Sequence, residues 1–251
     1  MIFNFNLKVR DKTILLLFFL ILSSCGRLQQ KQAIVYGQLK EGKGEKIVLT
    51  ELETKTIRKV DSVTLDTDGS FRFTVNLPET GFYMVHAPSG KVIVMLLNPG
   101  DTVNLSGMFP EFPDQVVLQG TGETGLLDEF FRFTRRNENA VDSLELLLAE
   151  NQDSSGYFGL TQRVDTAFKN IWDRQRAYEL EFIGKHPSSL VSLIVLNYAF
   201  GLNGILSPET DFACFERLDS SLTKSYPENK HVKYHHQRLM EYQRKHGRTL
   251  Q

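Results

Sequence analysis

The chain has 251 residues, of which 41% are hydrophobic, and its formal net charge is −1. This balance argues against nucleic acid as a partner, because phosphate backbones are bound through an excess of Lys and Arg. The length is enough for one large domain or two small ones. The only cysteines are Cys25 and Cys214, so the sequence has no Cys-x-x-Cys redox motif.

The amino terminus has the order of an export signal. Lys8, Arg10 and Lys12 precede an apolar run from Ile14 to Leu22. As a helix this run spans about 14 Å, which is about half of a ~30 Å hydrocarbon core. It is therefore too short for a transmembrane anchor and is typical of a secretory signal peptide.

The letters LSSC, which end at Cys25, resemble a bacterial lipobox. The resemblance implies that residues 1–24 are a lipoprotein signal peptide and that Cys25 becomes the lipidated amino terminus. Several acyl chains on one cysteine are enough for stable anchoring. Residues 25–33 are then a tether, and Gly26 after the cysteine favours the outer membrane. We expect a lipid-anchored protein of the cell envelope that faces the periplasm. The alternative is ordinary cleavage near Ser24, with Cys25 a free thiol.

Residues 34–120 have the pattern of short strands. Phe71, Phe73 and Val75 alternate with polar residues, which predicts a strand with one buried face. Asp68 and Gly69 supply a hairpin turn before it. The other expected strands are 34–39, 46–52, 56–65 (as one strand or two), 81–87, 91–97, 102–107 and 114–120. About eight strands with closely spaced turns predict an antiparallel β-sandwich or barrel.

Residues 121–251 have a helical period and predict an all-α domain, so the fold class is α+β. Two long helices are separated by a loop at 151–156. In the second helix apolar residues recur at steps of three and four from Val164 to Phe182, which predicts one buried face. We expect an apolar helix over 189–200, a helix capped by Ser207, and a basic final helix that is solvated.

Three places in the sequence carry residue types suited to chemistry, and none of them gives a catalytic, cofactor or metal site. Cys214 lies between phenylalanines and acids, which favours a buried structural thiol. His231 and His235 are one helical turn apart, a spacing that can bind metal, but the sequence offers no second pair. Asp66 and Asp68 flank a turn without enough further oxygen ligands for calcium. Cys25 is the one site residue, as the lipidation site.

The order of several motifs resembles that of the lipoprotein thiol-disulfide oxidoreductases of Gram-negative, gut-type bacteria. The motifs are VYGQL, DTDGSFRF, GFYMV, LLNPGDTVNLSG, VLQGTGETGLLDEF and FIGKHPSSLVSLIVL, and the resemblance spans Ile34 to Arg244. It implies a β domain of unknown function and a helical linker, which in that family precede a thioredoxin-like domain with a Cys-x-x-Cys pair. This chain has no such pair, so the resemblance assigns no catalytic residue.

These observations favour a non-catalytic envelope lipoprotein that acts as a binding or accessory module. Its partners are the membrane, through the lipid, and an envelope protein. The enzyme question stays open, although no catalytic constellation is visible. One alternative is a fragment or subunit of a thiol-disulfide oxidoreductase whose redox domain is on another chain. Another is a glycan- or peptide-binding lipoprotein that uses the loop aromatics Phe109, Phe112 and Tyr157.

The lipid anchor predicts the behaviour of a Cys25→Ala variant. Without the acyl chains nothing is expected to hold the chain on the bilayer, so the variant should leave the membrane fraction. Fractionation of cells followed by immunoblotting measures this, with Cys214→Ala as the matched control. Continued membrane attachment of Cys25→Ala would count against the anchor.

Overall fold

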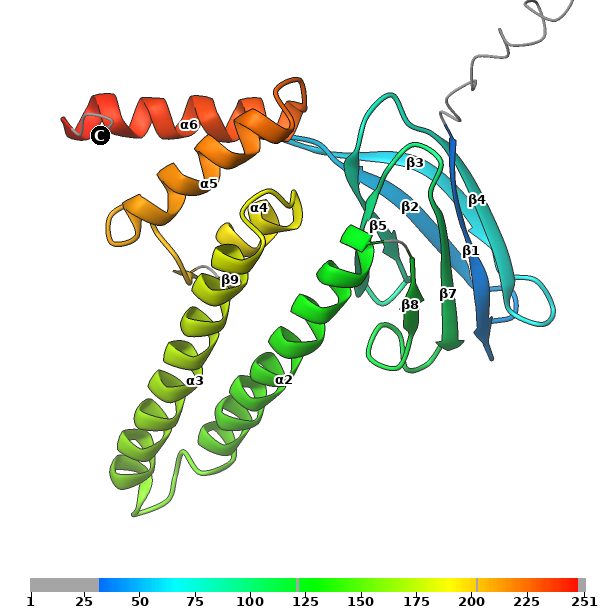
Figure 1. Ribbon diagram of the computed structural model, residues 1–251. Coiled ribbons are helices and arrows are strands. Elements are labelled where there is room, and N and C mark those ends of the chain that lie inside the picture. The colour runs from blue at the N-terminus through cyan, green and yellow to red at the C-terminus, as the bar shows by residue number, and fades with distance from the viewer. Residues whose placement is uncertain (1–31, 121, 202, 248–251) are drawn as a thin grey trace, which may run out of the picture.

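The computed structural model describes residues 32–120, 122–201 and 203–247. Cys25, the signal segment and most of the tether therefore lie outside the described residues. Within them the expected α+β class is confirmed, since strands fill the first part and helices the second (Figure 1). The change falls between Gln119, where the last of these strands ends, and Gly122, where the first described helix begins.

Eight strands form two four-stranded sheets, which are not closed into a barrel. Sheet A has the order β4 (Ser70–Asn76), β1 (Gln32–Lys40), β7 (Thr102–Met108) and β8 (Val117–Gln119). Sheet B has the order β3 (Ile57–Thr64), β2 (Lys46–Leu52), β5 (Gly81–His86) and β6 (Val92–Leu97). The expected antiparallel pairing holds for every strand pair of the two sheets except one, because β1 and β7 pair in parallel. The 56–65 segment forms a single strand.

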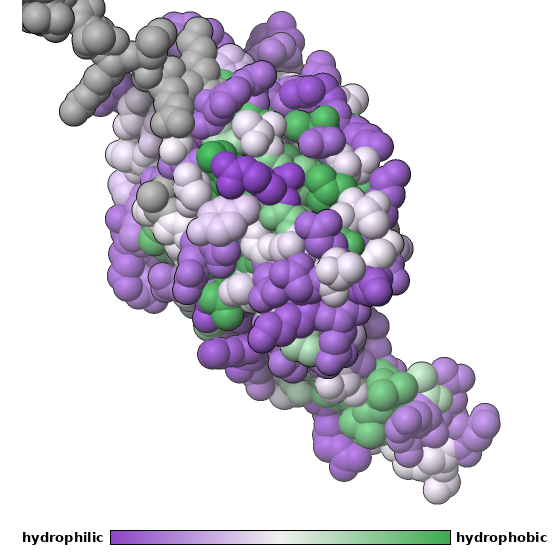
Figure 2. Space-filling model, turned by 90° about the vertical axis from the view of Figure 1, so that its right-hand side faces the viewer, coloured by the Kyte–Doolittle hydropathy of each residue, from purple (hydrophilic) through white to green (hydrophobic). Residues whose placement is uncertain are grey.

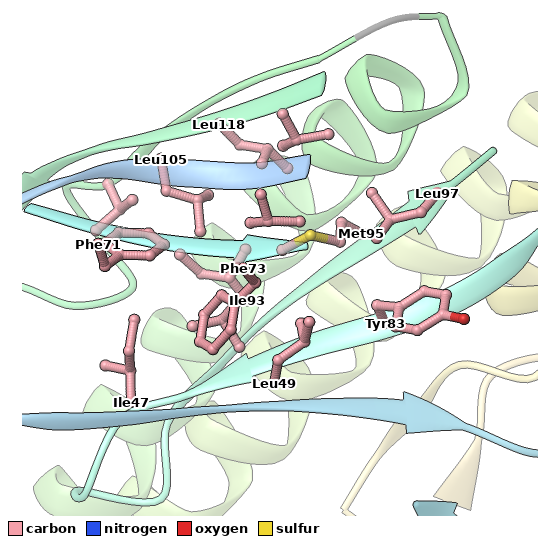
Figure 3. Close-up of a cluster of buried hydrophobic side chains, with 14 of the residues drawn as sticks. Ile47, Leu49, Phe71, Phe73, Tyr83, Ile93, Met95, Leu97, Leu105 and Leu118 are labelled. Carbon is pink, nitrogen blue, oxygen red and sulfur yellow. The ribbon is translucent and has the colours of Figure 1, made fainter. Parts of the chain in front are cut away.

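The first hydrophobic core lies between the two sheets. Figure 3 shows side chains of both sheets pointing toward one another, among them Phe73 and Leu105 of sheet A and Leu49 and Met95 of sheet B. All four are fully buried. The alternation in the sequence produces this face directly, because successive residues of a strand point to opposite sides of its sheet.

Sheet B is also covered on its other face, by the helices. Phe82 of β5 and Leu96 of β6 belong to the second core, which the helices complete. Every residue of β5 from Gly81 to Val85 is buried. This explains the unbroken apolar run of β5, since a strand covered on both faces has no wet side. The order of layers is therefore sheet A, sheet B and helices.

Five described helices follow, and the first two form a long hairpin that projects from the sheets (Figure 1). They are α2 (Gly122–Glu150), α3 (Tyr157–Lys185), α4 (Val191–Leu196), α5 (Phe212–Ser225) and α6 (Lys230–His246). The predicted loop at 151–156 separates α2 from α3. Thr124, in the first turn of α2, is buried and its Oγ1 donates to the carbonyl of Leu96 at 2.6 Å. This bond joins the hairpin to sheet B.

Two predicted helix boundaries were wrong. The apolar helix expected over 189–200 ends at Leu196, because the Asn197 side chain donates to the carbonyl of Leu193 at 2.7 Å. The chain then forms a small hairpin, β9 (Ala199–Phe200) with β10 (Asn203–Gly204). Ser207 does not cap the next helix. Its backbone N–H donates to the carboxylate of Asp211, and α5 starts one residue after that aspartate.

Helices α2 and α3 also share a buried polar network. The Gln175 amide donates to Thr134 Oγ1 and to Glu179 Oε1, each at 3.0 Å. Asn137 Nδ2 donates to Gln175 Oε1 at 2.8 Å. All four side chains are almost fully buried, and burial raises the pKa of Glu179 to about 8. The network fixes the register of the two helices, because each amide must face its partner.

The projecting end of the hairpin carries exposed apolar side chains. Phe158 is 75% exposed, and Leu146 and Leu147 are also exposed. Figure 2 shows a mostly hydrophilic face with hydrophobic surface near this end. In the part of the chain that the structure describes, no helix combines the length and the apolar character that a membrane span needs.

The elevated pKa of Glu179 predicts a pH-dependent effect of Glu179→Gln. Between the ordinary glutamate pKa of 4.5 and the folded value of about 8, the folded state holds the proton and the unfolded state loses it. The wild-type free energy of unfolding therefore falls as the pH rises through this window. Relative to wild type, Glu179→Gln should gain about 2 kcal/mol or more between pH 5 and pH 8.5.

Urea denaturation at both pH values measures this difference. Glu129→Gln, at an exposed position of α2, is the matched control and should show no such gain. If Glu179→Gln differed from wild type by the same free energy of unfolding at both pH values, the raised pKa of Glu179 would be contradicted.

Candidate functional site

Helix α6 is attached to the sheets at its first turn. Asn229 caps the helix, because its side-chain oxygen accepts from the backbone N–H of His231 at 3.0 Å and of Val232 at 3.4 Å. The side-chain amide of Asn229 donates to the carbonyl of Thr80 at 2.8 Å. One buried residue thus both starts α6 and ties it to the segment that enters β5.

A group of charges beside this cap joins α6 to the end of β2. The ammonium of Lys230 binds Glu51 and also Glu53, with 2.8 Å to Glu53 Oε2. The guanidinium of Arg58 on β3 binds the same two carboxylates. The Lys230 hydrogen bond lowers the pKa of Glu53. Glu51 is 5% exposed, so losing a cation would leave a poorly solvated carboxylate there.

A groove with a volume of about 650 Å³ lies beside this attachment, and we call it the junction groove. It is bounded by the end of β2, the helix-facing side of β5, α4 with the turns that follow it, α5 and α6. Its apolar lining comes from sheet and helices alike. The lining apolar residues are Leu52, Phe82, Leu193, Ile194, Leu196, Leu206, Pro208, Phe215 and Leu239.

Two histidines of α6, His231 and His235, line the groove one helical turn apart. The ring of His231 meets Phe82 edge-on at 4.9 Å between centroids, and that of His235 stacks on Phe215 at 6.3 Å. The Nε2 atoms of both are buried and have no hydrogen-bond partner in the protein. Burial lowers the pKa of His235, and burial together with Lys230 lowers that of His231 to about 4. Both rings are therefore neutral at pH 7.

The entrance of the groove is polar and aromatic. Tyr234 lies under two cations, with Lys55 Nζ at 5.8 Å and the Arg238 guanidinium at 6.0 Å from its ring centroid. Tyr242 stacks against His246 at 4.1 Å. These rings combine apolar faces with polar tips, so the groove passes from a wet rim to an apolar interior.

The structure places the other sequence candidates outside any shared site. Cys214 is a free, buried thiol, and burial raises its pKa, which confirms the structural interpretation. Asp66 and Asp68 both accept from the hydroxyl of Ser70 and hold the turn. Phe112 belongs to the core between the sheets and is not a loop aromatic available for stacking.

The prediction that the last helix is solvated was wrong for one of its faces. Val232, His235, Leu239 and Gln243 of α6 are buried, because this face closes the second core. Their spacing of three and four residues was the signal for that face, and the many charges of the helix obscured it. No group of three or more metal-ligating side chains occurs within the described ranges.

Comparison with known proteins assigns no family. No family model matches the chain, and no curated protein matches it.

The double role of Asn229 predicts graded losses of stability. Asn229→Ala removes both the cap and the bond to Thr80, and should lower the free energy of unfolding by about 2 kcal/mol. Asn229→Ser keeps a capping oxygen and loses only the bond to Thr80, so about half of that loss is expected. Urea denaturation measures both variants. Equal losses, or no loss in Asn229→Ala, would contradict the role given to this residue.

Proposed function

We propose that the protein is a non-catalytic, lipid-anchored envelope protein that binds a ligand in the junction groove. The groove carries the proposal. Its volume of about 650 Å³ falls within the roughly 300–1,000 Å³ of ordinary ligand sites. Apolar side chains with convergent polar groups are usual for such sites, and here the lining also contains charged groups, among them Glu53, Arg238 and Lys245.

The unpartnered imidazole nitrogens support a binding role. A buried polar atom without a hydrogen bond costs about 1–3 kcal/mol, and most buried polar atoms in proteins avoid this cost. His231 and His235 both leave Nε2 without a protein partner, and both line the groove. Two unpaired imidazole nitrogens thus belong to residues of the groove lining.

A non-catalytic role agrees with the state of the thiol that redox chemistry would need. The thiolate is the reactive form of cysteine. Cys214 is the free cysteine of the described residues, and its burial raises its pKa. The lipobox-like residues that end at Cys25 support the anchor and the envelope location. A lipid anchor would keep the groove at the membrane surface.

The proposal is tested by blocking the groove from its edge. Thr54 lines the groove but is not part of either core. Thr54→Trp should fill the entrance and leave the melting temperature unchanged, while Thr54→Ser is the matched control. The full chain is extracted from the envelope in mild detergent, and the compounds it retains are identified by mass spectrometry.

The expected result is one compound class retained by wild type and Thr54→Ser and lost from Thr54→Trp. Retention of no compound by wild type, or equal retention by Thr54→Trp, would contradict the proposed function.

A further inference from the structure

We infer that a second cleft, between α2 and the loop before β8, binds a phosphate monoester group through the guanidinium groups of Arg135 and Arg136. The cleft has a volume of about 310 Å³ and shares no lining residue with the junction groove, so the inference goes beyond the proposed function. We call it the arginine cleft. Its lining residues are Asp114, Gln115, Val116, Val117, Arg132, Arg135, Arg136 and Asn139.

One face of α2 supplies the polar wall of the arginine cleft. Residues at positions i, i+3, i+4 and i+7 share one side of a helix. The α2 residues of the lining have this spacing, from Arg132 to Asn139. The opposite face of the helix is buried, and it carries Leu127, Phe130, Thr134 and Asn137. Because that face is packed, the helix cannot turn about its axis, and the arginines stay on the side of the cleft.

The loop between β7 and β8 forms the opposite wall, and it is anchored from below. Phe112 and Val116 belong to the core between the sheets and are 2% and 6% exposed. The backbone N–H of Gln115 donates to the carbonyl of Glu111 at 3.1 Å. Figure 1 shows α2 running beside β8, with which it is in contact. The cleft therefore lies between two walls that the fold holds in place.

The carboxylates at the cleft are already paired with cations. Asp128, one turn before the lining residues of α2, binds Arg132 at 2.6 Å. Asp114 of the lining lies 3.5 Å from the ammonium of Lys91. These pairs leave no acid of the cleft for the two remaining arginines.

Arg135 and Arg136 have neither a hydrogen-bond nor an ion-pair partner among the described residues. Three guanidinium groups and one carboxylate line the cleft, so positive charge is in excess by two. Like charges this close on one helix face repel one another, and a bound anion would relieve the repulsion. The arrangement thus favours a doubly charged anion.

The geometry of guanidinium groups favours phosphate over a single carboxylate. Each group presents a planar fork of N–H donors that binds two oxygens of an anion at once. One fork already occupies both oxygens of a carboxylate. A phosphate monoester offers three free oxygens and carries a charge between about −1.5 and −2 at pH 7, so it can accept two forks and a further bond from the Asn139 amide.

Titration calorimetry with matched probes tests the inference. The full chain, in an uncharged detergent at pH 7.5 and low salt, is titrated with glycerol 3-phosphate, a monoester, and with glycerophosphoglycerol, a diester. The monoester should bind about tenfold more tightly, since it has more charge and one more free oxygen. Phosphatidic acid in the same detergent presents the monoester on a lipid. Tighter binding of phosphatidic acid assigns the site to a lipid headgroup, and equal or weaker binding assigns it to a soluble phosphate.

Three double variants locate the binding. Arg135→Gln with Arg136→Gln should weaken the binding of glycerol 3-phosphate about tenfold or more. Lysine at both positions keeps the charge without the planar fork, so a smaller loss is expected. Arg72→Gln with Arg163→Gln removes the same charge from exposed positions outside the cleft and should bind as wild type. All three should keep the wild-type melting temperature.

Failure of wild type to bind glycerol 3-phosphate would overturn the inference. So would an unchanged affinity in Arg135→Gln with Arg136→Gln, or an equal loss in Arg72→Gln with Arg163→Gln. Equal binding of the monoester and the diester would overturn the selection of a monoester. None of these outcomes bears on the proposed function, because the arginine cleft and the junction groove are built from different residues.

Discussion

The first turn of α6 is held against sheet B by partly buried polar contacts, and the candidate site depends on this attachment. Lys230 lies between Glu51 and Glu53, and Asn229 binds the backbone at Thr80 while capping the helix. Figure 1 shows α6 beginning near the ends of β2 and β3 and extending away from the sheets. An apolar contact alone would permit sliding, whereas these directional bonds fix where the helix starts. The distance between α6 and β5, and with it the groove, follows from that starting point.

Sheet B transmits this constraint to the rest of the molecule because it is shared by two cores. Tyr83 and Val85 of β5 face sheet A, and Phe82, on the opposite face of the strand, faces the helices. A change on one face of β5 therefore moves side chains on the other. Thr124 adds a second fixed point through its bond to Leu96. The helices are thus part of one packed body with the sheets, and the groove lies at a place where the packing between them is incomplete.

Much of the fold could be predicted from local patterns, because strand alternation and helix periodicity are properties of neighbouring residues. A strand and its buried face were predicted from the alternation of Phe71, Phe73 and Val75 with polar residues. The loop at 151–156 was predicted between two long helices. The parallel pairing of β1 with β7 could not be predicted, since five other strands separate the two in the sequence and no single turn connects them. Asn197 and Asp211 shifted two helix ends through side-chain bonds that composition does not show.

The candidate site was beyond sequence reasoning for the same reason. Lys230 and Glu51 are 179 positions apart, and nothing in either segment indicates that they meet. The spacing of His231 and His235 was visible, but their burial depends on Phe82 and Phe215, which come from other elements. A basic helix with a narrow apolar face is therefore easily taken for a solvated one.

Hydrogen exchange of the backbone amides of α6 tests the central claim most directly, because the groove exists only while this helix stays attached. The account predicts that amides in the buried middle of α6, around Leu239, exchange as slowly as those of β5. It also predicts that Lys230→Met speeds exchange in α6 while the strand β1 keeps its protection. Rapid exchange of α6 in the wild-type protein, with β5 protected, would show a detached helix and contradict the account.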